Sequence, residues 1–192
     1  MRIIAGSAKG RPISAVAHST RPTSDRAREA YFSTLTSVFG DFEGLNVLDL
    51  YAGTGAIALE ALSRGAAVVH AVENNDQACT AISANYDAIK SAQCPGIFHL
   101  YRMGVHKFVS DKAQYQYHII YIDPPYEVDD ADVAETLVQL KSNGFLHPDA
   151  LIAVERNSRV KELLWPDGYE EVRSKNYGQA VIFYANVEPV IA

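Results

Sequence analysis

Short apolar runs alternate with amphipathic stretches through the middle of this 192-residue chain. A short apolar run bounded by turn residues predicts a buried strand, and apolar residues recurring every three to four positions predict a helix. The predicted strands are Val47–Tyr51, Val68–Glu73, Ile97–Tyr101, His118–Asp123 and Leu151–Glu155. The predicted helices are Ala56–Arg64, Asp76–Lys90, Val105–Ser110 and Asp130–Ser142. This alternation predicts an α/β fold in which a mostly parallel sheet carries helices on both faces.

The carboxyl-terminal part of the chain has a different pattern. Glu170–Lys175 and Ala180–Asn186 are two strand-like segments on either side of Tyr177-Gly178. Two such segments around a tight turn predict a C-terminal antiparallel hairpin. We assign residues 41–192 to one main domain that includes this hairpin.

The first 40 residues predict a small extension in front of the main domain. Arg2–Ala5 and Arg11–Ala17 are expected to be short strands, because the two glycines between them permit a tight reversal. A helix capped at Thr23 or Ser24 then runs to about Val38. Residues 1–40 are therefore expected to form a β-hairpin followed by a helix.

Charge is distributed unevenly along the chain, whose formal net charge is −6. Residues 1–28 carry six basic residues and one acidic residue, whereas the remainder carries 11 basic and 22 acidic residues. A local basic surface can bind a polyanion while the rest of the protein stays acidic, although solvated surface arginines explain the charge equally well. The candidate residues for binding such a polyanion are Lys9, Arg11, Arg21, Arg26 and Arg28, and Arg2 shares the segment.

Composition limits the remaining possibilities. The chain is 48% hydrophobic and 21% charged, as in ordinary globular proteins, and no apolar run approaches the length of a membrane span. The two cysteines, Cys79 and Cys94, are too few for a disulfide scaffold, and the six histidines lack metal-ligand spacing. We therefore expect a cytoplasmic monomer without a metal site.

The segment Asp49–Ala56 lies where a predicted buried strand passes into a helix, and it contains Gly53 and Gly55. Open parallel sheets bind ligands at the carboxyl ends of their strands, where glycines let a ligand approach the backbone. Glu73 ends the next strand, at the place where such folds put an acid that binds ribose hydroxyls. The pattern predicts a nucleoside-containing cofactor.

Two cofactors satisfy this glycine pattern. Gly53 and Gly55 followed by Ala58 also match the dinucleotide fingerprint of an NAD-dependent oxidoreductase. Asp49 favours a cofactor derived from methionine instead of a dinucleotide. A carboxylate four residues before the first glycine would repel a pyrophosphate, whereas it would attract the ammonium of a methionine-derived ligand.

Asp123-Pro124-Pro125-Tyr126 follows the predicted strand ending at Ile122. The two prolines remove backbone donors and leave a stiff loop rich in acceptors, which is suited to an aromatic amine. The Asp123 carboxylate and the Pro124 carbonyl could accept the two N–H hydrogens of the amine. The nitrogen lone pair would then be free to attack a methyl group. Tyr126 can stack on an unstacked base. The alternative is a rigid surface turn.

Glu155-Arg156 ends another strand near the same edge of the sheet. We interpret this pair as a site of ion pairing, with contact to RNA as the alternative.

These motifs together resemble a known family. Asp49–Gly55 is similar to the first cofactor motif of class I methyltransferases, and Asp123–Tyr126 is similar to their amino-methylating motif. Other segments resemble the RsmD family, the 16S rRNA guanine-N2 methyltransferases. These segments are Arg2–Gly6, Lys9–Arg11, Arg21–Glu29, Leu59–Ala66 and Tyr177-Gly178.

The resemblance implies a Rossmann-like class I methyltransferase that transfers a methyl group from S-adenosylmethionine to one guanine of 16S rRNA in an assembled or partly assembled small subunit. By resemblance, Asp123, Pro124, Pro125 and Tyr126 hold the target base. The cofactor-binding residues would be Asp49, Tyr51, Gly53, Gly55, Glu73, Asn74 and Met103.

One segment departs from the family pattern. The family has an acid after the third strand for the adenine amino group, but the residues here are Tyr101–Val105. Met103 or backbone groups are then expected to meet the adenine. The alternatives are a DNA adenine-N6 or cytosine-N4 methyltransferase, an NAD-dependent oxidoreductase and a non-catalytic RNA-binding protein.

Overall fold

The computed structural model describes residues 1–14 and 25–188. It contains five helices and seven strands in the described part of the chain. The helices are α1 (Asp25–Phe39), α2 (Ala56–Ser63), α3 (Asp76–Lys90), α4 (Val105–Ser110) and α5 (Asp130–Ser142). The strands are β1 (Asn46–Leu50), β2 (Val68–Glu73), β3 (Ile97–Arg102), β4 (Tyr117–Ile122), β5 (Leu146–Asn157), β6 (Tyr169–Tyr177) and β7 (Ala180–Val187).

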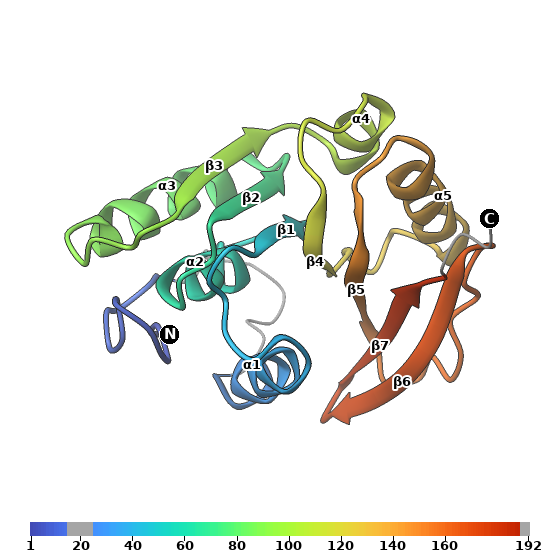
Figure 1. Ribbon diagram of the computed structural model, residues 1–192, viewed down its shortest axis with the longest axis horizontal. Helices are drawn as coiled ribbons and strands as arrows, with labels where there is room; N and C mark the ends of the chain where they lie inside the picture. The colour runs from blue at the N-terminus through green and yellow to red at the C-terminus, as the bar shows by residue number, and fades with distance from the viewer. Residues whose placement is uncertain (15–24, 189–192) are drawn as a thin grey trace.

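All seven strands form one sheet in the order β3-β2-β1-β4-β5-β7-β6, which can be followed across Figure 1. Strands β1 to β5 pair in parallel, whereas β7 pairs antiparallel with both β5 and β6. The predicted α/β fold with a C-terminal hairpin is confirmed. The chain order reverses between β1 and β4, and open parallel sheets bind ligands outside the carboxyl ends of the strands at such a reversal.

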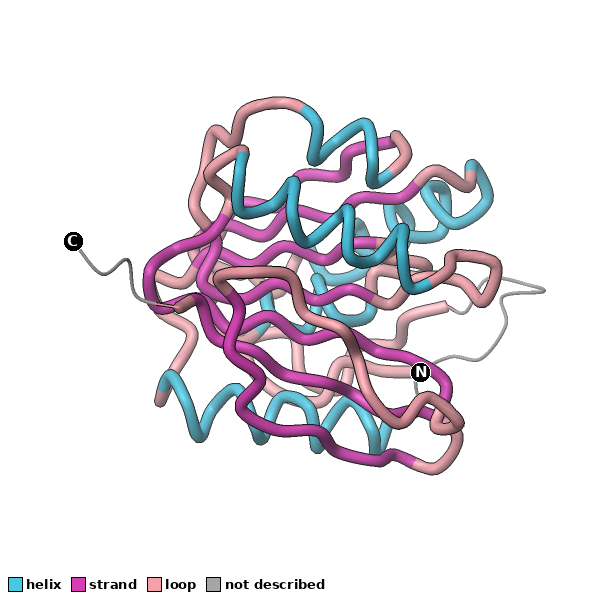
Figure 2. Tube along the Cα trace, turned by 90° about the vertical axis from the view of Figure 1, so that its right-hand side faces the viewer, coloured by secondary structure: helices cyan, strands magenta, loops and turns pink. Residues whose placement is uncertain are grey.

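Helices cover both faces of the sheet, as Figure 2 shows. One buried cluster lies under α1, α2 and α3 and includes Tyr31, Leu59 and Ile89. The other lies under α4 and α5 and includes Phe108 and Leu137. Because successive strand residues point to opposite faces, β1 and β4 supply side chains to both clusters and are buried along almost their whole length.

The strand pairing in the amino-terminal segment is shorter than predicted. Residues 1–14 contain a single antiparallel bridge, between Arg2 and Pro12, instead of two extended strands. The segment reverses through turns over residues 5–10. Residues 15–17 of the second predicted strand and the cap predicted at Thr23 or Ser24 lie outside the described residues.

This segment is fastened to α2 by buried polar contacts. Glu60 is fully buried, and its carboxylate accepts hydrogen bonds from the backbone N–H groups of Ile4 (2.7 Å) and Ala5 (3.0 Å). Gly6 has a φ of 80°, and a Cβ atom there would lie 1.8 Å from the Ser63 carbonyl oxygen. Only glycine allows this approach. Residues 1–14 therefore pack into the same core as the sheet.

Strand β5 begins at Leu146, five residues before its predicted start at Leu151. The pairing between β4 and β5 shifts between Tyr117 and Ile119, so that the residues around Pro148 form an irregularity inside one strand. Such an irregularity interrupts the apolar pattern of the sequence, and the interruption predicts a loop where the strand in fact continues. The carboxyl end of β5, which borders the site, is unaffected.

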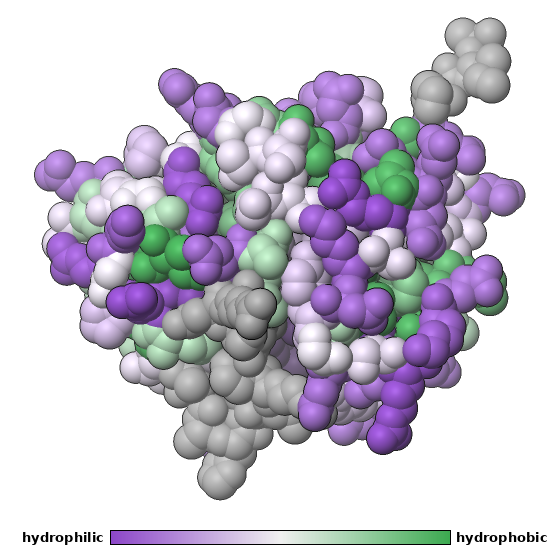
Figure 3. All heavy atoms as spheres, turned by 90° about the horizontal axis from the view of Figure 1, so that it is seen from below, coloured by the Kyte–Doolittle hydropathy of each residue, from purple (hydrophilic) through white to green (hydrophobic). Residues whose placement is uncertain are grey.

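The surface has an ordinary distribution of polarity. Figure 3 shows the face seen from below as mainly hydrophilic, with scattered hydrophobic residues. Within residues 1–14 and 25–188, no helix has the length and apolar character needed to cross a membrane.

Candidate active site

Three carboxylates lie at the carboxyl ends of neighbouring strands. Asp49 is near the end of β1, Asp123 directly follows β4, and Glu155 is near the end of β5. The pairing aligns Leu50 with Ile122 and Ile122 with Val154, so the strand ends are level. This edge is the one at which parallel sheets bind ligands.

The glycine loop between β1 and α2 adopts unusual backbone conformations. Gly53 and Gly55 have φ values of 56° and 73°, and Tyr51 also has a positive φ of 62°. A Cβ atom at Gly53 would meet nothing nearer than the Tyr51 carbonyl at 4.0 Å, so the backbone there is open to an approaching group. Burial raises the pKa of the Tyr51 hydroxyl, and the side chain of Thr136 on α5 acts in the opposite direction.

Asp49 connects this loop to α2. It is 2% exposed, and its Oδ2 accepts a hydrogen bond of 3.0 Å from the backbone N–H of Ala58. Burial, together with the nearby charge of Glu73, raises the pKa of Asp49 to about 7. A buried carboxylate of this kind is stabilised in its charged form by a cationic partner, which the ammonium of S-adenosylmethionine would supply.

Glu73 joins the glycine loop to the loop that begins α3. Its Oε2 accepts from Gly53 N (2.8 Å), and its Oε1 accepts from Asn74 N (2.9 Å) and Asn75 N (2.8 Å). A single carboxylate thus fixes the backbone of both loops that border the ligand crevice. Asn74 is exposed beside it.

The loop after β4 is held at both of its ends. Asp123 N donates to the Leu50 carbonyl at 3.4 Å, and Val128 N donates to the Pro125 carbonyl at 3.0 Å. Pro124 is buried, whereas Tyr126 is 57% exposed.

Arg156 provides the second anchor of this loop. Its guanidinium donates to the Val128 carbonyl (3.1 Å) and to Asp130 Oδ1 (2.8 Å). An ion pair is therefore present at the end of β5, but it joins Arg156 to Asp130, whereas Glu155 accepts a hydrogen bond from Tyr121. Because Arg156 is largely buried in these contacts, it positions the loop that carries Tyr126.

The environment of Asp123 strongly favours its neutral form. Its pKa is well above the usual range because of burial and the negative charges of Glu155 and Asp49, and Arg156 acts in the opposite direction. Strongly shifted acids in a crevice are typical of functional sites.

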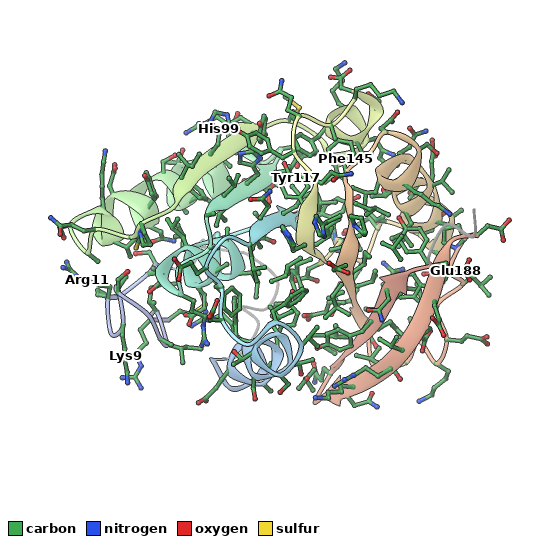
Figure 4. All side chains as sticks on the ribbon, in the orientation of Figure 1. Lys9, Arg11, His99, Tyr117, Phe145 and Glu188 are labelled. Atoms are coloured by element: carbon green, nitrogen blue, oxygen red, sulfur yellow. The ribbon has the colours of Figure 1, made fainter. Side chains whose placement is uncertain are left out.

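Met103 lies apart from these groups. It follows β3, two strands away from β1, and lines a cavity of about 110 Å³ in the second buried cluster. Tyr117 and Phe145, labelled in Figure 4, line the same cavity. The adenine contact expected of Met103 stays a prediction.

The basic residues of the first 28 positions divide into two kinds. Lys9 and Arg11 are exposed and extend outward from the amino-terminal segment in Figure 4. Arg28 is fully buried, and its guanidinium donates to the Arg2 carbonyl and to Met1 Sδ (3.8 Å). The expectation that Arg28 contacts RNA is corrected, because this side chain holds the amino terminus. Arg21 and the side chain of Arg26 lie outside the described residues.

Comparison with known proteins places the chain in a family. A family model described as Conserved hypothetical protein 95 matches residues 1–186. The chain is 33% identical over 156 residues to ribosomal RNA small subunit methyltransferase D of Escherichia coli (strain K12), covering 81% of this chain and 74% of that protein. The chain belongs to the RsmD family of methyltransferases.

Two further relatives agree with this assignment. Ribosomal RNA small subunit methyltransferase D of Haemophilus influenzae is 30% identical over 180 residues, covering 93% of this chain and 89% of that protein. The solved structure of yhhF from Escherichia coli has a TM-score of 0.83 at 30% identity, with 98% of each chain covered. As an RsmD-family methyltransferase the protein uses S-adenosylmethionine, which decides between the two cofactors that the glycine pattern allowed.

Sequence reasoning gave no role to Tyr121 or Glu60, and it assigned Glu155 only to ion pairing together with Arg156. Glu155 and Tyr121 are brought together only by the pairing of β4 with β5. Glu60 is an acid inside an otherwise apolar helix, and a buried charge at such a position signals a specific partner. That signal was readable in the sequence, although the partner was not.

Proposed function

We propose that this RsmD-family protein transfers a methyl group from S-adenosylmethionine to the exocyclic N2 of one guanine in 16S rRNA of the small ribosomal subunit. The observation that carries the proposal is the position of Asp123, which directly follows β4 at the edge of the sheet where Asp49 lies near the end of β1. The pairing aligns Asp49 with Tyr121, two residues before Asp123. The relatives named as ribosomal RNA small subunit methyltransferases support the choice of RNA.

The chain's own residues would divide the work as follows. S-adenosylmethionine supplies an electrophilic methyl group when bound. Asp49, Glu73 and the backbone of the glycine loop would hold it at the ends of β1 and β2. Asp123 and the Pro124 carbonyl would accept the two N–H hydrogens of the guanine amine, and Tyr126 would orient the base by stacking.

Acceptor preference tests the class of substrate. Small subunits lacking the modification, protein-free 16S rRNA and duplex DNA are offered to the protein with labelled cofactor in separate reactions. We expect transfer to small-subunit rRNA and none to DNA, because residues 1–14 and 25–188 form one sheet with its helices and include no separate domain for reading a duplex. Preferential transfer to DNA would contradict the proposal and favour the DNA amino-methyltransferase.

Replacing Tyr126 separates the ring from the hydroxyl. Tyr126→Ala is expected to lower kcat/KM for the subunit substrate, because base–aromatic stacking is worth about 1–3 kcal/mol. Tyr126→Phe keeps the ring and should cost much less. Steady-state kinetics of both variants provide the measurement. If phenylalanine is as damaging as alanine, the hydroxyl is the functional group and the stacking role is wrong.

Neutralising Lys9 and Arg11 together tests the basic segment. If both side chains contact phosphates, the double alanine variant should bind the substrate more weakly, and the log–log salt slope should fall by about 0.7 to 0.9 per lost contact. The matched control is a double alanine variant of Lys107 and Lys112, which are exposed on and just after α4. An unchanged slope for the Lys9 and Arg11 variant would place the RNA contact elsewhere.

A further inference from the structure

Glu155 lies beside the proposed acceptor of the target amine. Strands β4 and β5 pair in parallel with Ile122 aligned to Val154, so the next residues along the two strands are Asp123 and Glu155. Alternation along the strands puts both carboxylates on the same face of the sheet as Tyr121. The two acids are therefore nearest neighbours across adjacent strand ends.

Tyr121 fixes the orientation of Glu155. The Tyr121 hydroxyl donates a short hydrogen bond to Glu155 Oε2. Burial and the adjacent Glu155 carboxylate raise the pKa of Tyr121 far above its usual range, so this hydroxyl remains a donor. The Tyr121 ring is itself held by the fully buried Tyr31 of α1, with ring centroids 4.8 Å apart.

The ion pair of Arg156 is formed with Asp130 and not with Asp123 or Glu155. Arg156, the next residue on β5, directs its guanidinium to the Val128 carbonyl and to Asp130. Asp49 adds a further negative charge from β1, and Arg156 offsets these charges in part at Asp123. Two shielded acids side by side cannot both ionise easily, and their protons are bound by the pair.

We propose that Glu155 is a positioning residue for methyl transfer: its carboxylate, held against Asp123 by Tyr121, makes Asp123 a stronger acceptor for the proton of the target amine. The proposal rests on the assignment of Asp123 to that amine. The nitrogen lone pair forms the N–C bond, and the C–S bond breaks with its electron pair left on sulfur. The surplus proton on nitrogen passes to Asp123 and then to water.

The pH dependence of kcat distinguishes this role from a structural one. Activity requires Asp123 and Glu155 to be ionised, so kcat falls on the acidic side of its pH profile. Glu155→Gln removes the neighbouring charge, which lowers the pKa of Asp123 and should move the acidic limb to lower pH by about one unit. The plateau kcat should fall by up to about tenfold, because Asp123 is then a base weaker by about one pKa unit.

Two further variants complete the experiment. Glu155→Asp keeps the charge, and its acidic limb should stay close to that of the unaltered protein. Glu170→Gln, at an exposed position of β6, is the matched control and should change neither limb nor plateau. Binding of S-adenosylmethionine and the melting temperature verify that each variant is folded and loaded.

An unshifted acidic limb in Glu155→Gln would overturn the proposal, whether or not the plateau falls. A shifted limb with a lowered plateau would support it. The shift of the acidic limb of the pH profile does not depend on which base is methylated, because it can be measured with any acceptor that the protein methylates. Failure of the guanine assignment is detected separately, from the identity of the methylated nucleoside.

Discussion

Replacing Asp123 with alanine is expected to lower kcat for methyl transfer by at least about a hundredfold while leaving the affinity for S-adenosylmethionine nearly unchanged. The carboxylate is assigned to the target amine, where positive charge develops during transfer. Its loss therefore affects the chemical step and not the cofactor. Single-turnover kinetics with saturating cofactor measure this step, and calorimetry measures the cofactor affinity.

The stability of the same variant gives an independent control. The pKa of Asp123 in the folded protein is raised by burial and by Glu155 and Asp49. An acid with a raised folded-state pKa destabilises the fold at pH values above its unfolded pKa, where it must ionise against its surroundings. Alanine removes this cost, so the melting temperature at neutral pH should not fall. Asp123→Asn keeps an acceptor oxygen and should retain partial activity. Full activity of the alanine variant would show that Asp123 is not the acceptor.

Replacing Glu73 with alanine is expected to raise the dissociation constant for S-adenosylmethionine by about tenfold to a hundredfold, the effect of losing a charged acceptor worth about 1.5–3 kcal/mol. The structure adds a second reason. Three backbone N–H groups, those of Gly53, Asn74 and Asn75, lose their acceptor together, so both loops lose order.

Calorimetric titration with S-adenosylmethionine provides the measurement for Glu73. Glu135→Ala, an exposed acid on α5, is the matched control and should bind the cofactor normally. Binding of RNA without cofactor should be equal in all three proteins. An unaltered dissociation constant for the Glu73 variant would remove this residue from the cofactor site.

The order of strands and helices could be predicted because the central strands are buried on both faces and the helices between them are amphipathic. Periodicity therefore located β1, β2 and β4 to within a residue at each end. The start of β5 could not be predicted in the same way, because the residues around Pro148 interrupt the apolar pattern without ending the strand. Periodicity reports burial along one segment, and it does not report pairing with a neighbour.

The candidate site could be predicted in part for a related reason. Asp49, Glu73 and Asp123 all follow or end buried strands, and parallel strands bring their carboxyl ends to one edge. Glu155 ends a strand as well, but its contact with Tyr121 depends on which strands are neighbours. Arg28 was misjudged because its charge suggested solvent, whereas the Arg2 carbonyl satisfies it inside the protein.

Identification of the methylated atom tests the central claim most directly. Small subunits lacking the modification are incubated with the protein and labelled S-adenosylmethionine, and the rRNA is digested to nucleosides and analysed by mass spectrometry. Label should appear in N2-methylguanosine. Label in N6-methyladenosine or N4-methylcytidine would contradict the account.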